Sequence, residues 1–222
     1  MAHIAIFDLD RTITRYGTFT PFLLGTRRST LARAALMARI AGSMLSHKMG
    51  RLSRRQLKDR MLAHTFAGRS KRDVERHAEA FVERLLKQGV RSGALKAIAA
   101  HRAAGDILVL ATAAMDFYAA RIAERLGFDL VVATGTEWRL RHDGTHLPVL
   151  ATENCYGAEK LARLREALKE HLDQDGGAEL SFYSDHHTDE PVFDWVHRPA
   201  AVSPNRKLRS LARRRGMKVL DW

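Results

Sequence analysis

Two aspartates that directly follow a short apolar run constrain the fold of this chain more than any other feature. The apolar residues 4–7 lead into Asp8 and Asp10. A short apolar run bounded by charges predicts a buried strand, and its carboxyl end lies where open α/β sheets bind their ligands. Side-chain alternation places both aspartates on one side, where two adjacent negative charges need a cation. The pattern therefore indicates an α/β fold with a Mg²⁺ site rather than a polar turn.

The rest of the chain alternates short apolar runs with helical patterns. Helical patterns end at Gly127 and Gly216, and the last one begins near Pro204. Alternation of this kind predicts a doubly wound parallel sheet. The apolar runs expected to form its further strands lie at residues 107–111, 130–133, 180–183, 200–202 and 218–220.

A predicted hairpin interrupts this alternation. Its strands are expected at residues 137–141 and 146–150, and its turn at Asp143 and Gly144. An Asp-Gly pair between two strand patterns is typical of a tight hairpin turn. Residues 174–177 are expected to form a loop.

Residues 15–87 differ in character from the rest of the chain. They show helical patterns, with N-terminal capping signatures at Ser53 and Ser70. They contain 17 lysines and arginines against 5 acidic residues, so they carry the whole net charge of +12 of this 222-residue chain. We therefore expect a core of residues 1–14 and 88–222, interrupted by a basic helical insert of residues 15–87.

The composition is that of a soluble globular protein. No uncharged run approaches the ~18 residues that a transmembrane helix needs, and no signal-peptide pattern opens the chain. Cys155 is the only cysteine in the sequence, which excludes an intramolecular disulfide and is typical of a reducing compartment. We therefore expect a cytoplasmic protein in which Cys155 packs in a turn.

Two further polar signals lie at a predicted strand end and at a helix start. Thr112 follows an apolar run, so its hydroxyl group and the N–H groups of Ala113 and Ala114 can receive a phosphate oxygen. Lys160 lies in the first turn of a predicted helix. Taken alone, a threonine at a strand end and a lysine on a helix are more often structural.

Acidic residues follow a third apolar run. Asp185 and Asp189 come after residues 180–183, where they can complete a hard-cation site made of oxygen atoms. The alternative is an aspartate-rich helix cap. The adjacent His186 and His187 are expected to be loop residues, because nitrogen donors suit Mg²⁺ poorly.

The order of these motifs resembles that of the haloacid dehalogenase superfamily of phosphohydrolases. The four motifs of that family match Asp8 and Asp10, then Thr112, then Lys160, then Asp185 and Asp189. The resemblance is strongest to the phosphoserine phosphatase branch, subfamily IB, because the helical insert falls between the first two motifs. Asn154, Gly157 and Lys160 also look like that branch's third motif, and residues 201–205 like its closing stretch. The resemblance implies a Rossmann-like core with a small α-helical cap inserted after the first strand.

The resemblance and the residue types together imply phosphate ester hydrolysis. Asp8 would attack phosphorus and form an aspartyl-phosphate, and Asp10 would act first as general acid and then as general base. Mg²⁺ would be held by Asp8, the main-chain carbonyl of Asp10 and Asp185. Because halide departs without a proton and dehalogenases lack a second aspartate, Asp10 favours an oxygen leaving group.

The remaining motif residues are expected to support these groups. Lys160, Thr112 and Ala113 would bind the phosphoryl oxygens. Asp189 is expected to orient Lys160 or a metal-bound water, and Thr12 to support the loop after the first strand.

The helical insert weakens the likeness to phosphoserine phosphatases. Gly17 stands where they carry a glutamate that recognises the substrate amine, and Ser53 stands where they carry a phenylalanine. Arg60 does match the spacing of their substrate-binding cap arginine. We therefore expect a small phosphorylated metabolite as substrate, either phosphoserine-like or another phosphorylated amino alcohol.

The basic insert leaves two alternatives open. Residues 15–60 contain 11 lysines and arginines and one acid, Asp59, around an apolar stretch at residues 31–45. That stretch is either the apolar core of a cap with a solvated basic face, or a helix on an anionic bilayer. The second case predicts a peripheral protein at the inner membrane surface that hydrolyses a lipid phosphate, such as phosphatidylglycerophosphate. The sequence does not specify an oligomeric state.

A protein of a different class, a non-catalytic nucleic-acid binder, would also be basic. The insert lacks interleaved aromatic stacking residues, and the chain shows no known nucleic-acid-binding motif. We therefore do not expect a nucleic-acid partner.

Overall fold

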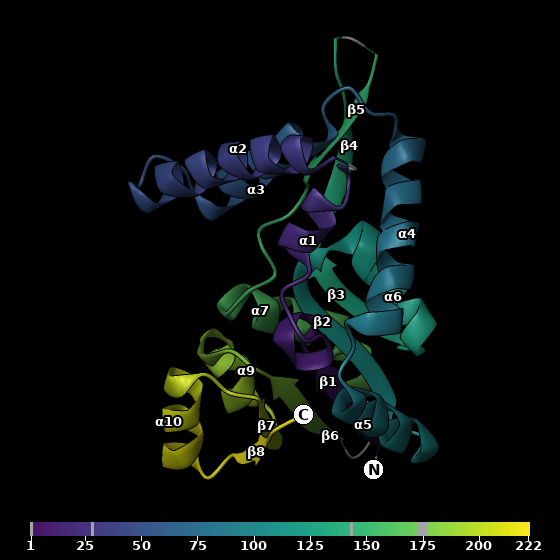
Figure 1. The fold of residues 1–222 in the computed structure, drawn as a ribbon. Coiled ribbons are helices and arrows are strands. Elements are labelled where there is room, and N and C mark those ends of the chain that lie inside the picture. Colours follow the sequence, from purple (N-terminus) through teal and green to yellow (C-terminus); the bar gives the residue numbers. More distant parts are fainter. Residues whose placement is uncertain (1, 28, 143, 173–176) are drawn as a thin grey trace.

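A six-stranded parallel sheet forms the centre of the molecule (Figure 1). This computed structural model describes residues 2–27, 29–142, 144–172 and 177–222. The strand order is β3-β2-β1-β6-β7-β8, so the chain winds outward in both directions from β1. The predicted doubly wound α/β fold is thus confirmed. Its strands are β1 (Ala2–Phe7), β2 (Ile107–Met115), β3 (Leu130–Thr134), β6 (Ala178–Ser184), β7 (Arg198–Val202) and β8 (Lys218–Leu220).

Strand β1 is central and buried on both faces. It pairs with β2 and β6, which aligns Phe7 with Leu110 on one side and with Tyr183 on the other. Ala5 and Phe7 belong to one apolar core, whereas Ile4 and Ile6 belong to the core on the opposite face. Two buried faces explain why β1 reads as a continuous apolar run without polar alternation.

Helices cover both faces of the sheet. The core that contains Phe7 includes residues of α5 (Ser92–Ala103) and α6 (Asp116–Leu126). The helices on the opposite face are α7 (Ala158–Ala167), the short α8 (Lys169–Leu172), α9 (Glu190–Trp195) and α10 (Arg206–Arg215). The carboxyl ends of the strands therefore remain as the edge at which ligands can enter.

The helical insert contains four helices in the described residues. They are α1 (Phe19–Leu24), α2 (Thr30–Lys48), α3 (Arg54–Phe66) and α4 (Lys71–Gln88). Ser53 caps α3 in a reciprocal capping box with Gln56, and Ser70 caps α4, as predicted. Helices α2 and α3 form a hairpin that projects beyond the sheet (Figure 1). In the described part of the chain, no helix combines the length and apolarity needed to cross a bilayer.

The insert begins and ends at one place. Thr14 and Val90 form an antiparallel bridge. The N–H of Arg15 donates to the carbonyl of Gly89 at 2.8 Å, and the N–H of Arg91 donates to the carbonyl of Ile13 at 2.9 Å. The two connections between core and insert are therefore hydrogen-bonded side by side.

The predicted hairpin forms, and it packs against the insert. Its antiparallel strands are β4 (Thr136–Leu140) and β5 (His146–Leu150). The N–H of Leu150 donates to Asp59 at 2.8 Å, and the guanidinium of Arg55 donates to the carbonyl of Leu150 at 2.6 Å. Both side chains come from α3, so the hairpin fastens that helix to the core. Asp143 of the predicted turn, and residues 174–176 of the predicted loop, lie outside the described residues.

Candidate active site

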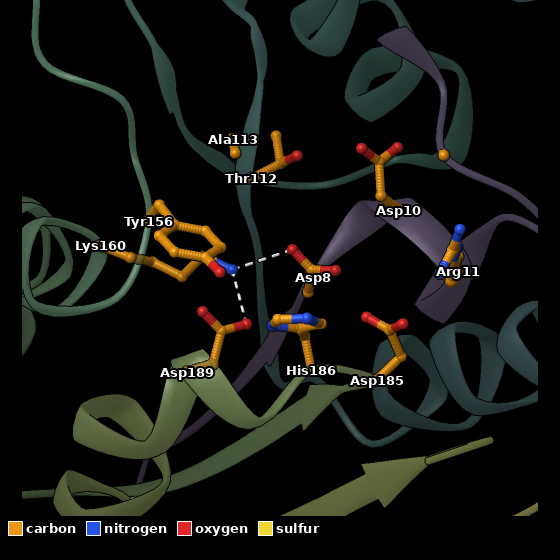
Figure 2. A pocket seen from close by; sticks show the side chains of 11 residues that line it. Asp8, Asp10, Arg11, Thr112, Ala113, Tyr156, Lys160, Asp185, His186 and Asp189 are labelled. Atoms are coloured by element: carbon orange, nitrogen blue, oxygen red, sulfur yellow. Dashed lines mark hydrogen bonds and ion pairs between the residues drawn. The ribbon is translucent and has the colours of Figure 1, made fainter. Parts of the chain in front are cut away.

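A cavity of about 280 Å³ lies at the carboxyl ends of β1, β2 and β6 (Figure 2). This is the point at which the strand order reverses, where open α/β sheets bind ligands. Most of the side chains singled out from the sequence meet here. The cavity is lined by Asp8, Asp10, Arg11, Gly17, Thr112, Ala113, Tyr156, Lys160, Asp185, His186 and Asp189.

Asp8 is the first residue after β1 and is 7% exposed. One carboxylate oxygen accepts a hydrogen bond from Lys160 Nζ at 2.9 Å, and the other accepts a longer one from the Thr12 hydroxyl at 3.3 Å. Burial raises the pKa of Asp8 to about 7, and the neighbouring Asp189 and Asp185 add to this shift while Lys160 opposes it. The Asp8 carboxyl group is therefore poorly hydrated and lies at the centre of the site.

A tight turn over Leu9–Ile13 brings Asp10 to the same cavity. Arg11 lies in the left-handed region with φ of 62°, which reverses the chain there. One oxygen of Asp10 accepts two hydrogen bonds of 2.7 Å from Thr18, one from its N–H and one from its hydroxyl. Burial raises the pKa of Asp10, against the effect of these bonds. Thr18, which the sequence analysis missed, thus fixes the orientation of Asp10.

Thr12 connects the two acidic loops. Its hydroxyl donates to Asp8 and accepts a hydrogen bond of 2.9 Å from the N–H of Asp185. The threonine is fully buried. One hydroxyl group therefore holds the loop after β1 in register with the loop after β6.

Lys160 lies between two carboxylates and is 2% exposed. Its Nζ is 2.9 Å from Asp8 and 2.9 Å from Asp189. Burial lowers the pKa of Lys160, but Asp189 and Asp8 together outweigh burial and raise it. Asp189 is itself positioned by the Ser184 hydroxyl at 2.7 Å. Lys160 is therefore a fixed positive charge beside Asp8.

Thr112 and Ala113 lie within β2, which continues four residues beyond the predicted run to Met115. The pairing of β2 with β3 shifts register between Ala111 and Met115, so this segment is irregular. Thr112 Oγ accepts the N–H of Ala114 at 3.0 Å. The Ala114 amide, suggested by the sequence as a phosphate donor, is thus already engaged.

The donor set of the cavity fits a hard cation. Asp8, Asp10 and Asp185 present carboxylate oxygens to the same space. Burial raises the pKa of Asp185 to about 6, with contributions from Asp189 and Asp10 that oppose Arg11. Among the described residues, none donates a hydrogen bond to the Asp185 carboxylate. Clustered oxygen donors with excess negative charge are what Mg²⁺ prefers.

His186 and His187 follow Asp185 in the loop after β6. His186 lines the cavity, but its Nδ1 is hydrogen-bonded to the Thr188 hydroxyl at 2.7 Å. Burial lowers its pKa, and His187 adds to the shift. His186 is thus a neutral residue in the lining of the cavity, and a hydrogen bond within its own loop fixes its position.

The insert contributes a lysine to this region and not the arginine expected from the motif. Arg60 is exposed and does not line the cavity. Lys58 instead donates to the carbonyl of Ala113 at 2.7 Å and to the side chain of Asn154. Burial lowers the pKa of Lys58 to about 8. No sequence pattern singles out Lys58, because its partners Ala113 and Asn154 come from distant segments of the chain.

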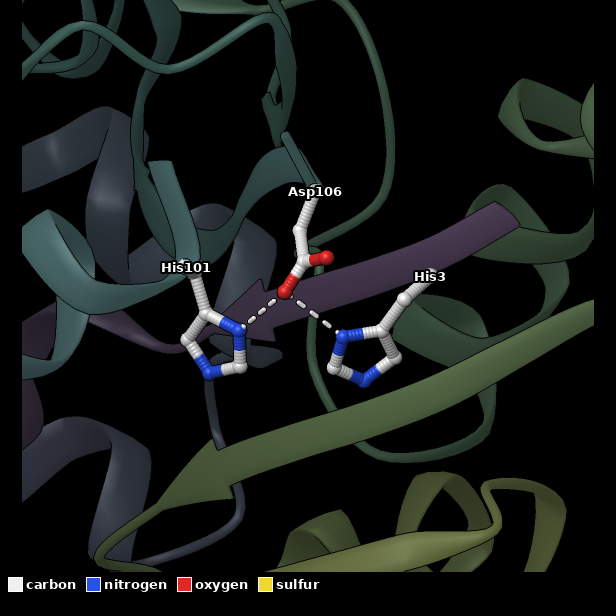
Figure 3. A group of neighbouring side chains, drawn as sticks. All are labelled: His3, His101 and Asp106. Atoms are coloured by element: carbon white, nitrogen blue, oxygen red, sulfur yellow. Dashed lines mark hydrogen bonds and ion pairs between the residues drawn. The ribbon is translucent and has the colours of Figure 1, made fainter. Parts of the chain in front are cut away.

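A histidine–aspartate cluster lies away from this cavity, toward the amino ends of β1 and β2 (Figure 3). His3 Nδ1 and His101 Nδ1 both contact one oxygen of Asp106, at 2.7 and 2.6 Å. Their Nε2 atoms are 2.9 Å from the hydroxyls of Ser181 and Tyr183 respectively. Every ring nitrogen of His3 and His101 has a partner. The cluster is therefore a complete hydrogen-bond network that links β1, β2, β6 and α5.

Comparisons with known proteins identify a family and relatives of this chain. Residues 5–194 match the family of haloacid dehalogenase-like hydrolases. Protein CicA of Caulobacter vibrioides is 31% identical over 163 residues, which are 73% of this chain and 71% of CicA. Phosphoserine phosphatase SerB1 of Mycobacterium tuberculosis is 30% identical over 156 residues, 70% of this chain and 49% of that protein.

A solved structure matches the whole chain. It is the crystal structure of a protein of unknown function from Bordetella pertussis Tohama I, with a TM-score of 0.83 and 28% identity. The match covers 100% of this chain and 99% of that one, so the similarity includes both the sheet and the insert. With the family match over residues 5–194, it shows that the chain belongs to the haloacid dehalogenase-like hydrolase family.

Proposed function

We propose that this protein is a Mg²⁺-dependent phosphomonoester hydrolase that acts through an aspartyl-phosphate on Asp8. The observation that carries the proposal is the buried arrangement of Asp8, with Lys160 Nζ at 2.9 Å on one side and Asp10 lining the same cavity. The family match and the relative named phosphoserine phosphatase support the same reaction class. The proposal places the enzyme in the cytoplasm, and buried, reduced Cys155 is consistent with that.

The first step is transfer of the phosphoryl group to the protein. A carboxylate oxygen of Asp8 forms a bond to phosphorus while the bond from phosphorus to the ester oxygen breaks. Asp10 donates its proton to the leaving ester oxygen, and burial favours the protonated form by raising the pKa of Asp10. Lys160, Thr112 and the Ala113 N–H are proposed to bind the non-bridging oxygens.

The second step returns Asp8 to its starting state. Asp10, now ionised, accepts a proton from water, whose oxygen attacks phosphorus and displaces the Asp8 carboxylate. Inorganic phosphate leaves, and Asp10 is protonated again. Asp189 keeps Lys160 in place throughout, and Thr12 holds the Asp8 loop against the Asp185 loop.

The proposed metal site consists of Asp8, the main-chain carbonyl of Asp10 and Asp185. A bound Mg²⁺ would supply positive charge that neutralises the carboxylates and the phosphoryl oxygens. Support comes from the lining of the cavity, to which Asp8, Asp10 and Asp185 all belong, and from the pKa of Asp8 and of Asp185, which burial raises and a nearby positive charge would lower.

A small substrate fits the proposed chemistry. The cavity of about 280 Å³ is lined in part by Tyr156, and the guanidinium of Arg54 from α3 lies 4.7 Å from the centre of the Tyr156 ring. We propose a phosphorylated metabolite, phosphoserine-like or another phosphorylated amino alcohol. A lipid phosphate such as phosphatidylglycerophosphate is the second candidate, because α2 exposes apolar side chains as described below.

The test is phosphate release from a panel of phosphorylated metabolites and phosphatidylglycerophosphate, with Mg²⁺ or with EDTA. We expect turnover that needs Mg²⁺ and that Asp8→Asn abolishes, while Asp221→Asn, at an exposed aspartate, retains it. Circular dichroism shows whether each variant is folded. Turnover by folded Asp8→Asn equal to that of the wild type would exclude the proposed nucleophile, and absence of turnover on every ester would exclude the proposed activity.

A further inference from the structure

We propose that the outer face of α2 docks this protein on the surface of an anionic phospholipid bilayer. The outer face comprises the exposed apolar residues of the helix: Leu31, Ala34, Ala35, Met37, Ala38, Ala41, Met44, Leu45 and the adjoining Met49. The proposal concerns where the protein binds and does not depend on the reaction proposed for the cavity.

Helix α2 is apolar on two opposite sides. Its inner side buries Leu36 and Ile40, which are 3% and 2% exposed. On the outer face, Leu31 is 81% exposed, Met44 is 55% exposed and Leu45 is 59% exposed. An ordinary surface helix places its charged residues opposite its buried side, so an apolar outer face needs an explanation.

The outer face is continuous along the helix. Met37, Met44 and Leu45 recur at spacings of seven and eight residues, which place them on the same side of the helix. Exposed alanines fill the turns between them. From Leu31 to Met49 the stripe is about 27 Å long at the usual helical rise. Elsewhere in the described residues, large exposed apolar side chains occur singly, as at Leu95 and Leu140.

The charges beside the outer face are all positive. Arg33, Arg39 and Lys48 lie on α2 itself, and none of them forms an ion pair within the described residues. The sequence has no acidic residue from 11 to 58, and the first one, Asp59, is engaged by the N–H of Leu150. An apolar stripe flanked by cations is the pattern of helices that lie in the interface of an anionic membrane.

A second copy of this chain fits the outer face less well. Pairing two outer faces would bring Arg33, Arg39 and Lys48 of both copies together, and α2 offers no carboxylate to compensate them. Phospholipid head groups supply negative charge at the flanks, and acyl chains accept the methionine and leucine side chains. Arginine and lysine can extend their charged ends toward the head groups.

The outer face is separate from the cavity, which makes the proposal testable on its own. No residue of the outer face lines the cavity. The hairpin of α2 and α3 contacts the core through side chains of α3, namely Arg55, Lys58 and Asp59. Catalytically disabled Asp8→Asn should therefore bind vesicles as the wild type does. Failure of the hydrolase proposal and failure of the docking proposal are thus distinguishable.

The first experiment is co-sedimentation with phosphatidylcholine vesicles that contain or lack phosphatidylglycerol. We expect binding to the anionic vesicles, and at least a tenfold lower affinity for Met44→Glu/Leu45→Glu, because two buried apolar contacts are lost. The matched control is Leu140→Glu, whose leucine is 65% exposed on β4 and should not contribute. No binding by the wild type at low salt, or equal loss in the control, overturns the proposal.

Light scattering on the same proteins tests whether a second copy of this chain binds the outer face instead. A monomeric wild type that binds vesicles supports docking on a bilayer. A wild-type dimer that Met44→Glu/Leu45→Glu converts to monomer, with no vesicle binding, would assign the outer face to self-association and overturn the proposal.

A fluorescent probe locates the contact on the molecule. Cys155 is fully buried and burial raises the pKa of its thiol to about 11, so an introduced cysteine can be labelled selectively. An environment-sensitive dye on Met44→Cys should shift to the blue with phosphatidylglycerol vesicles. The same dye on Leu95→Cys, on α5 at the far end of the molecule, should not (Figure 1). A shift at α5 and none at α2 would contradict the proposed orientation.

Discussion

The cavity and helix α2 place their side chains in opposite environments. In the cavity, Lys160, Asp8 and Asp189 are charged side chains buried from solvent, whereas on α2 apolar side chains such as Leu45 lie in solvent. Both arrangements are unfavourable for an isolated chain, because burial removes charges from water and exposure leaves hydrocarbon in it. Each arrangement fits the ligand proposed for it, which is a small charged one in the cavity and a large, partly apolar one on α2.

The largest expected effect tests the buried side of this comparison. Asp10→Asn keeps the hydrogen-bond acceptor for Thr18 but removes the exchangeable proton, so kcat should fall about 10³-fold, or about 4 kcal/mol of transition-state stabilisation. Steady-state phosphate release measures this. A kcat within threefold of the wild type would remove Asp10 from the proton transfers.

A second substitution asks whether the buried charges depend on one another for stability. Lys160→Met leaves Asp8 and Asp189 buried without their cation, so the free energy of unfolding should fall by about 3 kcal/mol. Urea denaturation measures it, with the exposed-lysine variant Lys207→Met as control.

The pH dependence of that loss has a definite sign. The pKa of Asp8 is about 7 in the folded wild type although Lys160 lowers it, so removal of Lys160 raises that pKa further. Asp8 of Lys160→Met therefore takes up its proton at a higher pH than Asp8 of the wild type, and the destabilisation should shrink as the pH falls from 9 toward 7. A loss that is independent of pH would indicate lost packing instead of unpaired charge.

Within α2, two leucines provide an internal comparison. Leu36→Ala removes a side chain that is 3% exposed and should cost about 2–3 kcal/mol, whereas Leu45→Ala, at 59% exposure, should change stability by less than about 0.5 kcal/mol. Thermal unfolding of both variants without vesicles measures this. A large loss at Leu45 would mean that the outer face is packed in solution.

The smallest effect concerns Lys58, a basic residue of the insert that contacts Ala113 in the lining of the cavity. Lys58→Met removes its bonds to Ala113 and Asn154, so KM should rise several-fold, equivalent to about 1 kcal/mol, with little change in kcat. The exposed Arg60→Met should leave both constants unchanged. A larger rise in KM for Arg60→Met than for Lys58→Met would instead indicate that Arg60 contacts the substrate.

Sequence patterns predicted the parts of this molecule whose physical signal is local. The apolar runs of the parallel sheet are continuous because both faces are buried, and Asp8 and Lys160 lie at element ends that the pattern places correctly. Thr18 and Lys58 were missed because their partners, Asp10 and Ala113, are set by the packing of separate elements. No local pattern reports such contacts.

The direction in which a helix faces was equally hard to read. Arg60 matches the sequence spacing of the cap arginine of phosphoserine phosphatases. However, α3 packs against the β4–β5 hairpin so that Arg60 is exposed and Lys58 points toward Ala113. For α2, the sequence left a buried core and a membrane face as alternatives. The structure shows that this helix has a buried apolar side and an exposed one, since Leu36 is covered and Leu31 is not.

The bridge between Thr14 and Val90 has an evolutionary consequence. Because the two connections of the insert lie side by side, its residues could be replaced by a short turn or by another domain without moving the ends of β1 or α5. Such a junction would let the insert be exchanged while Asp8 and Lys160 stay in place in the core. Chimaeras that exchange residues 15–89 with a relative should therefore carry over the membrane binding proposed for the donor's insert and keep the nucleophile proposed for the host's core.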